Sequence, residues 1–101
     1  MFYRKQGLIH KKLEYLDASD CNLKEAGLNN LPRLKFAKLS RNQISIFPDV
    51  HYSNMLQSLD LAYNNLKDLS RISITNLPKL RKLDLSGNFY CFFNLMIFLK
   101  F

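Results

Sequence analysis

Apolar residues recur along this chain in a pattern that is most regular in residues 80–88, which read Leu-x-x-Leu-x-Leu-x-x-Asn. Three earlier stretches repeat it, so four copies begin at Leu13, Leu34, Leu56 and Leu80. These starts are 21, 22 and 24 residues apart. Self-similarity with a period of about 20–50 residues is the signature of a repeat architecture. The pattern therefore predicts a solenoid.

Apolar and polar residues alternate within each copy, which predicts a short strand with one buried face. Stacking one strand per repeat gives a four-stranded parallel sheet with strands about 4.8 Å apart. Residues 68–77 form the longest return between strands and are predicted to hold a helical turn or two, whereas the two shorter returns are expected to be 3₁₀ or extended. The apolar anchors of the returns are Leu28, Leu31, Phe47, Val50, Leu69, Ile72, Ile74 and Leu77.

One position recurs where the chain turns away from each strand, and it is held by Cys21, Asn42, Asn64 and Asn88. Buried backbone groups at a turn need partners, and an Asn side chain offers both donors and acceptors. We expect the three Asn side chains to bridge successive turns as a hydrogen-bonded ladder. Cys21 takes the same place in the first copy and is a weaker hydrogen-bonding group.

These motifs are similar to those of the leucine-rich-repeat family over residues 13–91, and the short period resembles the intracellular type of repeat. The resemblance implies an α/β solenoid with a four-stranded parallel sheet on its concave face and mostly irregular, 3₁₀ or helical returns on its convex face. It also implies a protein-interaction module without catalysis. Residues 13–19, 59–66 and 77–88 more narrowly resemble the X-ray radiation resistance-associated proteins, whose chains are longer than this one.

Strand residues that face away from the core should form columns, because the repeats stack. Three acids in one column beside aromatic side chains suit a protein partner with a basic and apolar patch, and Tyr and Arg are enriched among binding hot spots. A solvated face without a partner is the alternative, since strands place polar residues outward in any case. The predicted partner-binding residues are Tyr15, Asp17, Phe36, Lys38, Arg41, Asp60, Tyr63, Lys82 and Asp84.

The formal net charge of +7 raises the alternative of nucleic-acid or anionic-surface binding. Its distribution argues against that function. Residues 1–12 contain four bases and no acid, whereas residues 13–99 contain ten bases and eight acids, a difference of only +2. We therefore expect a basic N-terminal tail over residues 1–12 and a protein partner in preference to nucleic acid.

An apolar stretch occupies residues 89–101 and is interrupted by Asn94. A membrane-spanning helix needs about 20 apolar residues, so membrane insertion is not favoured. Self-association and packing of a last return on the fourth repeat are the other interpretations. Solenoid ends normally carry polar caps, and no such cap is evident here. We expect residues 92–101 to be an apolar tail, and a truncated fragment of a larger leucine-rich-repeat protein is a further alternative for this chain.

Neither pair of chemically versatile residues predicts a reactive centre. Cys21 and Cys91 fall in the first and fourth coils, about 14 Å or more apart, which is too far for a disulfide. His10 and His51 are distant in the repeat register and lack metal-ligand spacing. We therefore predict no enzyme, metal, cofactor or small-molecule substrate. The sequence lacks an apolar signal run and an Asn-x-Ser/Thr site, so we expect an intracellular protein, cytoplasmic or nuclear.

Overall fold

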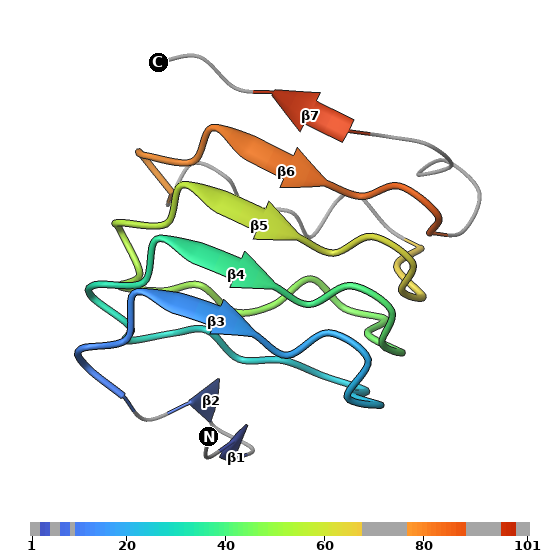
Figure 1. Cartoon of the computed structure of the whole chain (residues 1–101), viewed down its shortest axis with the longest axis horizontal. Helices are drawn as coiled ribbons and strands as arrows, with labels where there is room; N and C mark the ends of the chain where they lie inside the picture. Colours follow the sequence, from blue (N-terminus) through green and yellow to red (C-terminus); the bar gives the residue numbers. More distant parts are fainter. Residues whose placement is uncertain (1–2, 5–6, 9, 68–76, 89–95, 99–101) are drawn as a thin grey trace.

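Four short parallel strands, one from each repeat, lie side by side in sequence order (Figure 1). The computed structural model describes residues 3–4, 7–8, 10–67, 77–88 and 96–98, with side-chain exposure for 10–67 and 77–88. The parallel strands are β3 (Tyr15–Asp17), β4 (Phe36–Lys38), β5 (Ser58–Asp60) and β6 (Lys82–Asp84). The predicted solenoid with its four-stranded parallel sheet is confirmed.

The central residue of each parallel strand points into the core. Leu16, Ala37, Leu59 and Leu83 are aligned in register across the sheet, and each is at most 1% exposed. Their neighbours on both sides face outward, because successive side chains of a strand point to opposite faces. The alternation seen in the sequence therefore sets which residues reach the outer face of the sheet.

The return segments close the core opposite the sheet. Leu28, Leu31 and Leu77 are fully buried there, and Phe47 and Val50 nearly so. The other predicted anchors lie outside the described residues, as do residues 68–76 of the return for which helical turns were expected. Burial of the returns against the strands explains why a chain with strands of only three residues can enclose an apolar interior.

Turns and bends make up the described returns, which contain neither α-helix nor 3₁₀-helix. Their backbone groups bond between neighbouring coils instead: Leu28 N–H donates to the Asp49 carbonyl at 2.7 Å, and Asn30 N–H donates to the His51 carbonyl at 2.8 Å. An isolated parallel bridge joins Gly27 to Asp49. Since these bonds satisfy the backbone, the returns need no helical hydrogen bonds.

The sheet has a fifth strand that the repeat pattern did not predict. β7 (Met96–Phe98) pairs antiparallel with β6, so the described sheet runs in the order β3-β4-β5-β6-β7 (Figure 1). An exposed strand edge presents unpaired backbone groups that readily accept another strand. Part of the stretch predicted to be an apolar tail therefore completes the hydrogen bonding of β6.

Two further short strands lie within the segment predicted to be a basic tail. β1 (Tyr3–Arg4) pairs antiparallel with β2 (Gly7–Leu8), and Figure 1 shows this pair at the β3 end of the molecule. The N-terminal strands and the antiparallel β7 thus lie at opposite ends of the parallel array.

Candidate functional site

The outer face of the parallel sheet, which we call the strand face, brings most of the predicted partner-binding residues together. Two columns cross it in register. The first contains Tyr15, Phe36, Ser58 and Lys82, and the second contains Asp17, Lys38, Asp60 and Asp84. The two remaining predicted residues, Arg41 and Tyr63, lie in the turns that follow β4 and β5 and are exposed.

Two aromatic rings stand exposed at the β3–β4 end of the strand face. Tyr15 is 52% exposed and Phe36 is 41% exposed. Their ring centroids are 6.3 Å apart and their planes are tilted by 44°. Aromatic pairs at this separation attract each other in tilted arrangements. The pair therefore presents apolar surface in a defined arrangement.

The acids of the second column also stabilise the turns that follow their strands. Asp17, Asp60 and Asp84 each accept a hydrogen bond at 3.0 Å from the backbone N–H two residues later, through Oδ1. Asx turns of this kind are common where a chain leaves a strand. The bond to Ser19 N–H is the largest cause that lowers the pKa of Asp17, because it favours the charged carboxylate. Sequence reasoning missed this role, although an Asp two residues before Ser or Ala recurs in three repeats.

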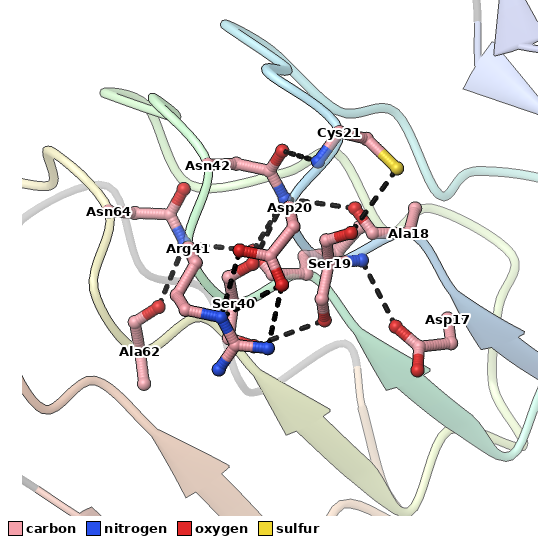
Figure 2. A network of polar contacts seen from close by, with 11 residues as sticks. Asp17, Ala18, Ser19, Asp20, Cys21, Ser40, Arg41, Asn42, Ala62 and Asn64 are labelled. Atoms are coloured by element: carbon pink, nitrogen blue, oxygen red, sulfur yellow. Dashed lines mark hydrogen bonds and ion pairs between the residues drawn. The ribbon is translucent and has the colours of Figure 1, made fainter.

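Arg41 is held in place by Asp20 from the preceding repeat (Figure 2). Its Nε donates to both carboxylate oxygens at 2.9 Å, and Nη2 lies 2.8 Å from Oδ2. This hydrogen bonding lowers the pKa of Asp20 and raises that of Arg41. Both side chains remain exposed, so the pair is screened by solvent and fixes geometry more than it adds stability.

The residue that lies three positions after the end of each parallel strand has a left-handed backbone in all four repeats. The φ angles are 56° for Asp20, 55° for Arg41, 57° for Tyr63 and 71° for Gly87. Only glycine adopts this region without steric cost. A Cβ built on Gly87 would lie 2.4 Å from Cδ1 of Tyr63, so the tyrosine ring rests directly over the glycine. The exposed ring of Tyr63 therefore depends on glycine at position 87.

The three ladder asparagines are buried and bond to the backbone of their own coil and of the preceding one. Figure 2 shows two of them, Asn42 and Asn64. Asn42 Oδ1 accepts from Cys21 N–H at 3.0 Å and from Leu23 N–H at 2.9 Å. Asn64 and Asn88 each accept one such bond from the preceding coil, and all three Nδ2 groups donate to carbonyls on both coils. These bonds fix the spacing between successive turns.

A second bridge between coils was not foreseen from the sequence. Ser53 is fully buried, and its hydroxyl accepts from Leu31 N–H at 3.1 Å and donates to the Leu28 carbonyl. Cys21, by contrast, is an exposed free thiol whose Sγ lies 3.3 Å from the Ser19 carbonyl, while Cys91 is outside the described residues. A serine in a return gives no signal by residue type alone, because most serines are exposed.

On the return side of the molecule, one histidine and one aspartate contact each other. His51 Nδ1 lies 2.6 Å from Asp49 Oδ1, and this hydrogen bond is the largest cause that lowers the pKa of Asp49. Within the described segments, no group of three or more His, Cys, Asp or Glu could hold a metal ion. The same part of the chain contains no helix with the length and hydropathy of a membrane span.

Comparison with known proteins gives matches over most of the chain. Two leucine rich repeat family models match residues 12–34 and 51–89. Toll-like receptor 2 of Macaca mulatta and of Homo sapiens are each 37% identical over 86 residues, which is 84% of this chain. The Ovis aries protein is 32% identical over 84 residues. The chain spans only 11% of the length of each of these relatives. No solved structure matches significantly.

These relatives overturn the prediction of an intracellular protein, because they are receptors by name. That prediction rested on the lack of a signal run and of a glycosylation site, together with the short repeat period. Two absences within about a tenth of a receptor's length carry no information on where the protein resides. The narrower resemblance to X-ray radiation resistance-associated proteins is not confirmed by these matches.

Proposed function

Because this chain belongs to the leucine-rich-repeat family, we propose that it binds a protein partner on the strand face. Domains of this family generally mediate protein–protein interaction and are typically not enzymes. The observation that carries the proposal is the exposed Tyr15–Phe36 pair beside the charged column. Aromatic side chains are enriched at protein–protein interfaces, and here two of them are adjacent on one face.

Rigidity supports the same proposal. Arg41 is oriented by Asp20, and the ring of Tyr63 is seated over Gly87. Side chains that are already ordered lose less conformational entropy when a partner binds. The margin of the strand face therefore offers two hot-spot residue types in fixed positions.

A quantitative pull-down tests the proposal. The full chain is immobilised beside a Tyr15→Ala/Phe36→Ala variant and a Tyr52→Ala control, and the captured proteins are identified by mass spectrometry. Tyr52 is a suitable control because it is 71% exposed and lies in a return segment. Removing a hot spot costs about 2 kcal/mol or more. We expect at least one partner that the wild type and the control retain and that the double variant loses.

Equal recovery on all three baits would show that the strand face is not the binding surface, provided that circular dichroism finds each bait folded. The alternative of nucleic-acid binding has its own result. If the baits capture nucleic acid, its binding should weaken steeply with salt and should be lost when residues 1–12 are deleted. That result would support nucleic-acid binding in place of protein binding.

A further inference from the structure

Charges on the β3–β4 half of the strand face compensate each other. Asp20 is paired with Arg41 at 2.8 Å, and Asp17 is the register neighbour of Lys38. Two acids and two bases leave this half without net charge. The exposed aromatic pair lies on the same two strands, so the half offers mainly apolar contact to a partner.

The β5–β6 half is acidic instead. Asp60 and Asp84 are register partners on adjacent strands and are only partly buried, and Lys38, the register neighbour of Asp17, is also that of Asp60 on its other side. Neither carboxylate forms an ion pair with a base in the described part of the chain. Lys82 lies in the neighbouring column, so the strand residues of β5 and β6 themselves include two acids and one base, a net charge of −1. This local sign is opposite to the +7 of the whole chain.

The two acids are held in position by their own turns. Each uses Oδ1 to accept the backbone N–H two residues later at 3.0 Å, and Asp84 Oδ1 also accepts from the Ser86 hydroxyl at 2.6 Å. Like charges directly opposite each other on neighbouring strands are destabilising. A cation placed between these carboxylates would relieve that repulsion and gain attraction from both.

Resting on the strand-face function proposed above, we infer that the partner is a polypeptide segment with a basic and an apolar side chain in a fixed spacing. The basic side chain, arginine or lysine, meets Asp60 and Asp84, and the apolar side chain packs on Tyr15 and Phe36. The middle of β3–β4 is two strand spacings from the middle of β5–β6, or about 10 Å. A segment in the polyproline II conformation covers that distance in about three residues, at about 3.1 Å per residue, and its three residues per turn place both side chains on the same face.

Peptide selection tests this inference. Random dodecapeptides displayed on phage are selected on the immobilised full chain, on Asp60→Asn/Asp84→Asn, on Tyr15→Ala/Phe36→Ala and on a Glu25→Gln control. Asparagine keeps the Oδ1 acceptor, so the turns should survive the loss of charge. Glu25 is an exposed acid in the first return. The control removes one negative charge away from the strand face.

We expect the wild type and the control to enrich peptides with a basic residue about three positions from an apolar one. The Asp60→Asn/Asp84→Asn chain should lose the basic preference. A selected peptide should bind about two- to fivefold more weakly for each carboxylate removed, and high salt should reproduce part of that loss.

Peptides that depend on Tyr15 and Phe36 but show no basic preference, or keep it on the asparagine variant, would overturn this inference and leave the strand-face function standing. Selection that is the same on all four chains, or no enrichment on the wild type, would overturn both. Melting curves recorded beforehand show whether each variant is folded. A change in the selected peptides can then be attributed to the altered side chains and not to unfolding.

Discussion

Replacing Asn64 with alanine tests whether the ladder holds the coils together. Asn64 is 5% exposed, accepts one hydrogen bond, and shares the two N–H groups of its amide among three carbonyls. Its Oδ1 accepts from Ile44 N–H in the preceding coil at 3.0 Å. Its Nδ2 donates to the carbonyls of Leu39, Leu61 and Ala62 at 2.9, 3.1 and 3.3 Å.

The backbone groups that lose Asn64 are not affected equally. Each of the three carbonyls keeps a second donor, which is Asn42 Nδ2 for Leu39, Asn88 Nδ2 for Leu61 and Arg41 N–H for Ala62. Ile44 N–H has no other described acceptor, and Ile44 is fully buried. An unsatisfied buried donor costs about 1–3 kcal/mol, and the weakened carbonyl bonds add about 1 kcal/mol in total. We therefore expect Asn64→Ala to lower the unfolding free energy by about 2–4 kcal/mol.

Urea unfolding followed by circular dichroism measures this difference, with Asn54→Ala as the matched control. Asn54 is exposed in a return segment, so its replacement should change the unfolding free energy by less than about 0.5 kcal/mol. A thermal melt gives an independent reading, since about 1 kcal/mol shifts the Tm of a domain of this size by roughly 4–8 °C. If the two alanine variants unfold at the same urea concentration, the ladder does not stabilise the fold and the reasoning from unsatisfied donors fails here.

Three further predictions concern the glycine turn, the acid column and the core. Gly87→Ala should lower the unfolding free energy by about 1–3 kcal/mol, because position 87 has a left-handed φ and the added Cβ would clash with Tyr63. Adding Tyr63→Ala should restore only the part of that free energy that is lost through the clash, which a double-mutant cycle in urea would show. Asp17 has a folded-state pKa below its usual value, so its contribution to the unfolding free energy is present above the unfolded-state pKa and is lost as pH falls through the folded-state pKa. Unfolding measured against pH should therefore show the wild type losing stability relative to Asp17→Asn in that acid range. Parallel curves would contradict a stabilising role for the Asp17 carboxylate. Leu59→Ala, at a fully buried strand centre, should cost about 2–5 kcal/mol in the same assay, and a cost below about 1 kcal/mol would mean that the core is not packed as described.

Leucine spacing alone predicted the register of the parallel sheet. The strand centres Leu16, Ala37, Leu59 and Leu83 align as the repeat starts imply, although the starts are 21, 22 and 24 residues apart. Unequal periods do not disturb the register, because extra residues are accommodated in the returns. The columns of the strand face follow directly from that alignment.

Features that depend on pairing outside the repeat were not predictable in the same way. β7 joins β6 in the antiparallel direction, and a tail of apolar residues does not reveal which edge it will meet. In the sequence, the acids of the second column gave no sign of a local hydrogen bond. In the structure, Asp17, Asp60 and Asp84 each accept the backbone N–H two residues later. Their strand-face position could be predicted, whereas the local hydrogen bond depends on backbone geometry.

The side-chain hydrogen bonds that join different coils share a property that bears on how the chain unfolds. Those described span between 19 and 27 residues, which is one repeat. Each coil is therefore coupled to its immediate neighbours, as in a one-dimensional array whose stability is a sum of unit and interface terms. Such arrays open from their ends, so amide hydrogen exchange should be slowest in β4 and β5, which have a repeat strand on each side.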